Sequence, residues 1–299
     1  ISKKDVVFEL TIICQKVDIF DVSDNESIDV DTFIDLYAVG EILNQKQVAI
    51  YVNGNNLRGT GHIYRVLELA DEFLSKPDIY YDLNQTDRGL FGKTTHNLKP
   101  VNGIVELFQI IKEKQYTIVI NDILSTSLDY MIGLRSVMPK GGKIVNFEDE
   151  GEGAGQADLV FNALYSEKVE GNIYGGEKYY IAPKIFALYK PIQVKDKVEK
   201  VFISFGGADP QNYTYQLLDI IVKDKYKRMK FVIAIGRAKM NINAVLEFNK
   251  YENIDVWYDV KNMPELMSEC DVGMTSRGRT AFELAMLGVP AIVLSQNTR

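Results

Sequence analysis

Short apolar runs recur along most of this chain, and several are followed by a turn and then by apolar residues at helical spacing. Between residues 46 and 190 the runs predict strands at 47–52, 78–82, 116–122, 143–148 and 158–162. The helical spacing predicts helices at 66–74 and 104–113. Near-continuous apolar strands that alternate with helices are typical of a parallel sheet covered on both faces.

A second alternation follows a charged, proline-containing stretch at 190–200, which is typical of a linker. Its strands are predicted at 201–205, 230–235, 254–258, 271–275 and 291–294, and its helices at 211–224, 264–270 and 280–287. Because 299 residues are too many for one ordinary core, two domains are expected. The predicted fold class is α/β, with two Rossmann-like domains, 46–190 and 191–299, that face a cleft. In such sheets, ligands bind outside the carboxyl ends of the strands.

The sequence pattern within residues 1–45 predicts a strand at 6–14 and a helix at 33–43. These two elements are too few to form a core. The acidic stretch between them is interpreted as a solvated turn in which Asp31 or Thr32 caps the helix. It also resembles the C-terminal end of CMP-sugar cytidylyltransferases, where an Ile-Asp-X-Asp-Thr sequence leads into the last helix. That resemblance implies a remnant of such an enzyme at 1–45. Asp29 and Asp31 match by position the aspartates that help to hold magnesium in that family, and no cytidylyl transfer is expected here because its nucleotide-binding body is absent.

Composition narrows the function classes. Apolar residues make up 46% of the chain and charged residues 25%, as in soluble globular proteins. The net charge is −7 and no basic stripe is present, so no nucleic-acid partner is expected. Cys14 and Cys270 belong to different predicted parts and form no Cys-X-X-Cys pair, which argues against a disulfide framework or a zinc site. No apolar run approaches the ~18 residues of a membrane span and no signal peptide is recognisable, so we expect no membrane partner and a cytoplasmic location.

The most informative stretch is the glycine-rich turn at 59–65, which lies between a predicted strand and a predicted helix. Gly59 and Gly61 let the backbone approach a ligand and direct helix N–H groups at an anion. His62 lies where an imidazole can take a proton from substrate or water, although a helix-terminal residue bonded to backbone is an equal alternative. Arg65 suits a phosphate or an ordinary surface salt bridge. A dinucleotide fingerprint is incomplete, because Tyr64 occupies its third glycine position.

Two further glycine-containing turns precede helices in the second half. Gly206 and Gly207 end a strand and predict an anion-binding nest, with a simple tight turn as the alternative. The stretch 275–285 combines a glycine turn with Glu283 in the following helix, where an acid can bond the two hydroxyls of a ribose or stabilise the helix dipole. This combination is more specific than either element alone.

Two other polar features are interpreted as structural. The acidic residues 148–152 predict a solvated loop at a cleft rim, and a metal site there is the less favoured alternative because no histidine or third ligand lies nearby. His96, in a polar loop, is expected at the surface.

Over residues 46–299 the chain resembles the UDP-2,4-diacetamido-2,4,6-trideoxy-β-L-altropyranose hydrolase family of pseudaminic acid biosynthesis, whose fold is similar to that of GT-B glycosyltransferases of the MurG type. The matching stretches are the Gly-X-Gly-His-X-X-Arg turn at 59–65, Asp122 after an apolar strand, 147–150 with 157–162, 175–180, 206–209, 276–283 and 296–297. Arg277 and Arg279 make the second half more basic than we expect for this family.

The resemblance implies site roles. His62 would be the general base that activates water at the anomeric carbon, and Asn297 would help to position water or sugar. Glu283 would hold the ribose. The remaining substrate- or nucleotide-binding residues would be Gly59, Gly61, Arg65, Asp122, Gly206, Gly207, Ser276, Gly278 and Thr280. The resemblance implies no metal and no cofactor, further helices after residue 299, and a parent protein in which a cytidylyltransferase domain is fused to this hydrolase.

Two alternatives share the same nucleotide site. One is a GT-B glycosyltransferase that moves the sugar to an acceptor instead of water. The other is a non-catalytic domain that binds a nucleotide sugar and regulates the fused synthetase. The exact sugar and the choice between uridine and cytidine stay open.

Overall fold

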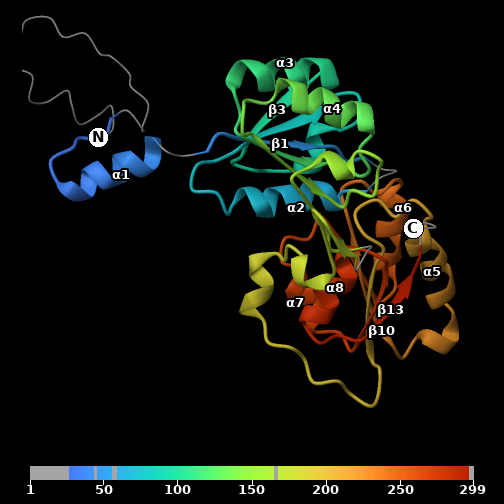
Figure 1. The fold of residues 1–299 in the computed structure, drawn as a ribbon. Coiled ribbons are helices and arrows are strands. Elements are labelled where there is room, and N and C mark those ends of the chain that lie inside the picture. Colours follow the sequence, from blue (N-terminus) through green and yellow to red (C-terminus); the bar gives the residue numbers. More distant parts are fainter. Residues whose placement is uncertain (1–26, 44–45, 56–58, 165–167, 296–299) are drawn as a thin grey trace, which may run out of the picture. The chain divides into compact units, whose positions relative to one another are not determined.

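The computed structural model describes residues 27–43, 46–55, 59–164 and 168–295. The chain divides into two compact units, residues 1–45 and 46–299. The first unit contains helix α1 (Phe33–Leu43), labelled in Figure 1. It begins directly after Thr32. The Asp35 carboxylate accepts the backbone N–H of Thr32 at 2.7 Å, and Thr32 Oγ1 accepts that of Asp35 at 3.2 Å. Thr32 therefore caps the helix, as predicted. The strand predicted at 6–14 and Cys14 lie outside the described residues.

The second unit contains two sheets. The first has eight strands, in the order β3 (Asn97–Val101), β2 (Asp78–Asp82), β1 (Val48–Val52), β4 (Ile118–Asp122), β5 (Lys143–Phe147), β6 (Leu159–Asn162), β8 (Ile173–Gly175) and β7 (Val169–Glu170). Every pairing is parallel except that of β7 with β8. The chain order reverses between β1 and β4, which makes the carboxyl ends of these two strands the switch point where ligands bind in such folds.

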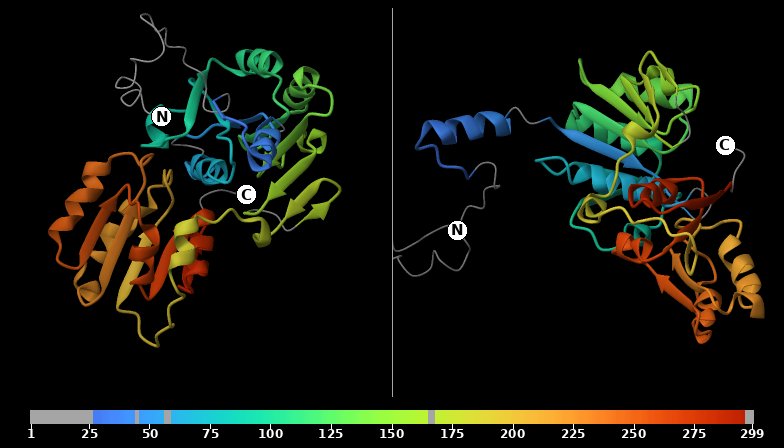
Figure 2. Two further views of the ribbon diagram at one scale, coloured as in Figure 1. Left: turned by 90° about the vertical axis from the view of Figure 1, so that its left-hand side faces the viewer. Right: turned by 90° about the horizontal axis from the view of Figure 1, so that it is seen from below.

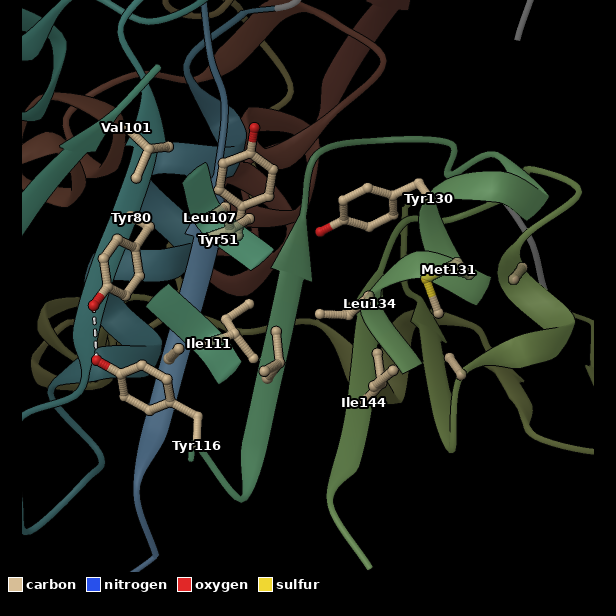
Figure 3. Close-up of a cluster of buried hydrophobic side chains, with 14 of the residues drawn as sticks. Tyr51, Tyr80, Val101, Leu107, Ile111, Tyr116, Tyr130, Met131, Leu134 and Ile144 are labelled. Atoms are coloured by element: carbon tan, nitrogen blue, oxygen red, sulfur yellow. Dashed lines mark hydrogen bonds between the residues drawn. The ribbon is translucent and has the colours of Figure 1, made fainter. Parts of the chain in front are cut away.

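Strand β1 is buried on both faces of the sheet, because apolar residues on each face pack against helices. Ala49 and Tyr51 pack with helices α3 (Ile104–Lys114) and α4 (Leu128–Val137), in the cluster drawn in Figure 3. Ile50 and its neighbours pack on the other face with helix α2 (Gly61–Ala70). Tyr80 and Tyr116 bury their rings at the edge of the first cluster and satisfy their hydroxyls by a mutual 2.7 Å hydrogen bond.

The second sheet is five-stranded and parallel, in the order β11 (Ile254–Tyr258), β10 (Lys230–Ile235), β9 (Lys200–Ser204), β12 (Val272–Ser276) and β13 (Ala291–Leu294). Helices α5 (Tyr213–Ile221) and α6 (Ile242–Leu246) cover one face. Helices α7 (Met263–Ser268) and α8 (Arg279–Met286) cover the other (Figures 1 and 2). The order reverses between β9 and β12, so this sheet has a switch point of its own.

The predicted fold class, two Rossmann-like parallel sheets with helices on both faces, is confirmed. Short 3₁₀ helices occupy several loops: η1 (Arg88–Phe91), η2 (Ala154–Gln156), η3 (Glu177–Tyr179), η4 (Lys184–Leu188), η5 (Asp224–Tyr226) and η6 (Glu247–Lys250). Ile185, Phe186 and Tyr189, which precede the predicted linker, pack with the core of the second sheet. In the part of the chain that the structure describes, no helix is long and apolar enough to cross a membrane.

Several elements differ from those predicted from the sequence. Helix α2 begins at Gly61, five residues earlier than predicted, and His62 therefore lies in its first turn. Helices α4 and α6 and strands β3, β7 and β8 were not predicted. Strand β3 contains Pro100 and lies at the edge of the sheet, where a missing N–H is tolerated, so its sequence lacks a strong strand signal.

Candidate functional site

A cavity of about 370 Å³ lies where the carboxyl ends of the two sheets meet. From the first sheet it is lined by the loop after β1 and the start of α2. From the second sheet it is lined by the loops after β9, β10, β11 and β12. Each predicted site residue in the described part lines this cavity, except Asp122: Gly59, Gly61, His62, Arg65, Gly206, Gly207, Ser276, Gly278, Thr280 and Glu283. Asn297 lies outside the described residues.

Asp122 lies behind His62. It is the last residue of β4 and is fully buried. Its Oδ1 bonds to His62 Nδ1 by a short contact. Its two oxygens also accept Arg65 Nη2 and Nε, each at 2.7 Å, so the guanidinium binds the carboxylate with both arms. Arg65 is only 3% exposed, which rules out the ordinary surface salt bridge considered from the sequence.

The hydrogen bonds fix the tautomer of His62. Burial alone would raise the pKa of Asp122, but the charges of Arg65 and His62 outweigh it and lower the pKa to about 2. An ionised carboxylate only accepts, so Nδ1 carries the hydrogen. Arg65 Nη2 lies 3.1 Å from the same nitrogen but has no lone pair there to donate to. His62 therefore has Nε2 as its basic nitrogen, on a ring that lines the cavity.

Glu148 adds a second carboxylate to this network. Its Oε1 lies 3.3 Å from Arg65 Nη1 and accepts the backbone N–H groups of Ala163 at 3.0 Å and Leu164 at 3.2 Å. Burial raises the pKa of Glu148 to about 7, although Arg65 opposes the shift. The side chain is thus neutral at mildly acid pH and charged at alkaline pH.

Asp149, the next residue, faces a different network. Its carboxylate accepts the backbone N–H and the hydroxyl of Thr126 at 2.8 and 2.7 Å and Asn146 Nδ2 at 2.6 Å. Glu148 and Asp149 are 2% and 1% exposed, so the predicted solvated loop is wrong for these two residues, while Glu150 and Glu152 are exposed. The acidic run was misinterpreted because Arg65 and Thr126, which bond to its first two residues, are distant in sequence.

Because the pKa of Glu148 is raised in the folded state, the free energy of unfolding should depend on pH. The folded state holds a proton at pH 4.5–7 that the unfolded chain, with the ordinary pKa of 4.5, has lost. This contribution is complete below pH 4.5 and disappears as pH rises through 7, a fall of roughly 3 kcal/mol in the free energy of unfolding. Urea unfolding of the wild type and Glu148→Gln between pH 4.5 and 8 measures it. The variant should lack this fall; equal slopes in both proteins would contradict the prediction.

On the opposite side of the cavity, the backbone of Gly207 packs directly against Thr60, the residue before α2. A Cβ added at 207 would overlap Thr60 Oγ1 and lie 3.0 Å from Thr60 Cβ. Gly206 has a φ of +80°, a conformation that favours glycine. The two glycines therefore allow the loop after β9 to approach the start of α2.

We expect Gly207→Ala to lower the free energy of unfolding by about 2 kcal/mol, because its Cβ must displace Thr60. Thr60→Ala removes the overlapping Oγ1, so the double variant should regain much of the loss. Urea unfolding of both variants and of Thr60→Ala alone provides the test. Equal losses in Gly207→Ala and the double variant would show that the contact is not the cause.

Asp209 follows the predicted anion nest at Gly206 and Gly207 and bonds to the helix that comes next. Its carboxylate accepts the N–H groups of Tyr213 and Thr214 at 2.9 and 3.0 Å, and so occupies the N-terminus of α5. Lys239 Nζ lies 2.8 Å from the same carboxylate, and both side chains are buried. The N-terminus of α8 differs, because no side chain caps it at Gly278. The uncapped end of α8 is the better anion site of the two.

Glu283 lies in α8 with its carboxylate 3.4 Å from Tyr180 Oη and 3.9 Å from Arg279 Nε. Burial raises the pKa of Glu283, while Arg279 and Tyr180 oppose the shift. The Arg279 guanidinium also lies over the Tyr180 ring, 5.2 Å from its centre. These contacts hold the acid at the cavity wall.

Some residues at or near the cavity were not proposed from the sequence. The surface position expected for His96 is wrong. Glu68 lines the cavity, and its helical spacing from Gly61 and Arg65 could have indicated this. Lys239, which pairs with the cavity residue Asp209, carries no sequence signal, because its partner is set by the fold. His96, expected at the surface, has a side chain only 5% exposed, with Nε2 3.1 Å from Asp71 Oδ1. Within the described ranges, no group of three or more His, Cys, Asp or Glu side chains could hold a metal ion.

Comparison with known proteins gives two distant relatives. No protein-family model matches the chain. It is 28% identical over 275 residues to the uncharacterized protein MJ1062 of Methanocaldococcus jannaschii, a match that covers 84% of this chain and 56% of that protein. It is 27% identical over 265 residues to the spore coat polysaccharide biosynthesis protein SpsG of Bacillus subtilis, covering 83% of this chain and 77% of SpsG. The chain thus spans about half the length of the archaeal relative.

Solved structures with the same architecture include Acinetobacter baumannii MurG, with a TM-score of 0.56 and 14% identity over 85% of this chain and 80% of that one. Anabaena HepE in complex with UDP-glucose has a TM-score of 0.53 and 11% identity over 83% and 80%. Staphylococcus aureus MnaA with UDP has a TM-score of 0.52 and 13% identity over 84% and 80%. These likenesses show the GT-B fold for the described residues of the second unit.

Proposed function

We propose that this protein is an enzyme of polysaccharide biosynthesis that binds a UDP-sugar in the cavity and hydrolyses it to UDP and free sugar. The observation that carries the proposal is the buried His62–Asp122 pair, which leaves a basic imidazole nitrogen on a ring at the cavity, opposite the glycine loops of the second sheet. Support for the substrate class comes from HepE and MnaA, whose structures contain UDP-glucose and UDP, and from the polysaccharide role in the name of SpsG.

In the proposed reaction, His62 Nε2 takes a proton from a water molecule, and the water oxygen attacks the anomeric carbon. The bond between that carbon and the UDP oxygen breaks with inversion, and UDP leaves with the bonding electron pair. Backbone N–H groups at Gly206, Gly207 and the start of α8 would stabilise the leaving diphosphate. The proton on His62 then returns to solvent.

The remaining roles are those that the family resemblance implies, and the described residues among them line the cavity. Ser276, Gly278 and Thr280 would contact the diphosphate or the base, and Glu283 would bond the ribose hydroxyls. Gly59 and Gly61 would let the sugar approach the first sheet. Because its guanidinium is engaged by two carboxylates, Arg65 would fix Asp122 instead of binding phosphate. Asn297 would position water or sugar.

The test incubates the full-length protein with UDP-2,4-diacetamido-2,4,6-trideoxy-β-L-altropyranose and no acceptor, and follows UDP and free sugar by NMR. Release of both products supports a hydrolase. Binding of an intact substrate, with turnover only when an acceptor is added, would replace the hydrolase with a GT-B glycosyltransferase. Binding without any turnover would favour a regulatory nucleotide-sugar-binding domain.

We also propose that residues 1–45 are the end of a CMP-sugar cytidylyltransferase fused to this enzyme in a longer parent. The acidic stretch that leads into the Thr32-capped helix α1 supports this origin. Assay of the full-length parent for CMP-sugar formation from CTP and a nonulosonic acid is the test. A parent that forms no CMP-sugar would contradict it.

A further inference from the structure

Glu148 is buried and does not contact His62 directly. It is connected to that imidazole through Arg65 and Asp122. We propose that it is a positioning residue: acting through Arg65 and Asp122, its carboxylate supplies the negative charge that allows His62 to hold a proton during turnover. This inference rests on the proposed function, since it concerns the same site.

The connection runs through one guanidinium. Arg65 uses Nε and Nη2 for Asp122, at 2.7 Å each, and turns Nη1 toward Glu148 Oε1 at 3.3 Å. The side chains of all three residues are at most 4% exposed. In such surroundings charges are weakly screened, so the charge of Glu148 is felt across the whole network.

The conformation of Glu148 is costly, which argues against a role in packing alone. Its φ is +52°, in the left-handed region that a long side chain seldom adopts. Its backbone N–H donates to Phe161 O at 2.9 Å, and its carboxylate accepts the N–H groups of Ala163 and Leu164. These bonds hold a carboxylate toward Arg65 in a place where an apolar side chain would avoid the cost of burying a charge.

The sum of the charges in this network explains why an ionised Glu148 would favour the protonated form of His62. Asp122 and Arg65 cancel, so protonation of His62 would leave one uncompensated positive charge at the N-terminus of α2, the positive end of the helix dipole. An ionised Glu148 makes that state neutral. The charged and titratable groups around Glu148 are Arg65 on α2, Asp122 at the end of β4 and, through Asp122, His62; burial also raises the pKa of Glu148 to about 7. The base is therefore supported most strongly at neutral and alkaline pH.

The test uses the fact that the chain has only two histidines. NMR of the 15N-labelled imidazoles, without substrate, gives a titration curve for each ring, and His62→Asn identifies the His62 signals. In Glu148→Gln the His62 curve should move to lower pH by roughly 0.5 to 1 unit. Glu148→Asp, which keeps the charge, should restore most of the wild-type curve, and Glu150→Gln, an exposed neighbour, should leave it unchanged.

A His62 curve that is the same in Glu148→Gln and the wild type, or that moves equally in Glu148→Asp, would overturn the proposal. If Glu148→Gln fails to give a native amide spectrum, Glu148→Met takes its place. With the nucleotide sugar, Glu148→Gln should show kcat about tenfold lower at pH 7 with KM unchanged. A wild type without turnover would refute the proposed function, whereas the NMR result would still decide the role of Glu148.

Discussion

Replacing His62 with asparagine is expected to slow the release of UDP by about 10³-fold and to leave the Kd for UDP within about twofold. Asparagine Nδ2 can donate to Asp122 as His62 Nδ1 does, so the buried network keeps its hydrogen bond. The substitution removes only the basic Nε2. NMR of product formation and calorimetric titration with UDP measure the two quantities separately.

His96→Asn is the matched control for this variant. His96 is the second histidine of the chain, and its imidazole contacts Asp71 and does not line the cavity. Its replacement should leave turnover unchanged. Retention of more than a tenth of the wild-type rate in His62→Asn would mean that another group takes the proton from water.

Asp122→Asn is expected to lower both activity and stability. An amide cannot carry the charge that orients His62 and stabilises its protonated form, so turnover should fall by about 10³ to 10⁴-fold. It also leaves the buried Arg65 without its two 2.7 Å acceptor contacts to a carboxylate, which should cost about 3 kcal/mol of unfolding free energy. Kinetics at pH 8 and urea unfolding give the two values.

A double variant separates these effects. In Asp122→Asn with Arg65→Met the uncompensated guanidinium is absent, so much of the lost stability should return. Turnover should stay low, because the carboxylate that orients His62 is still missing. A double variant as unstable as Asp122→Asn would contradict the view that an unpaired buried charge causes the loss.

Much of the fold was predictable because most buried strands are short apolar runs with clear ends. Strand β10 coincides with its prediction at 230–235 and β11 with 254–258. Strand β3 was not predicted, because its residues lie at an edge and include Pro100. The early start of α2 was missed because Gly61, Thr60 and Gly59 favour a turn in isolation, and tertiary packing of Ile63 and Val66 overrides that preference.

The parts of the site that follow directly after strands were predictable, because glycine turns after apolar runs mark the ends of those strands. In the β1–β4 register Val52 pairs with Asp122, so the carboxylate lies beside the end of the strand that leads to the glycine turn. Asp122 was proposed only from the family resemblance. The Glu148–Arg65 contact was not predictable, since 83 residues separate the partners and nothing near Glu148 indicates a cation. Two adjacent acids with separate buried partners have the same sequence pattern as a solvated loop.

The passage between the two sheets occurs once, along residues 176–199, in the described chain. Within the described residues 46–295, a chimera that exchanges one sheet for that of a GT-B relative therefore crosses between the sheets at this passage alone. The contacts that it must preserve across the cavity region include Gly207 with Thr60, Arg279 with Gly61, and Arg237 with Leu90 O at 3.1 Å. Recombination that preserves these contacts would let the two halves be inherited independently, so selection can alter the ligand preference of one half while the other is kept.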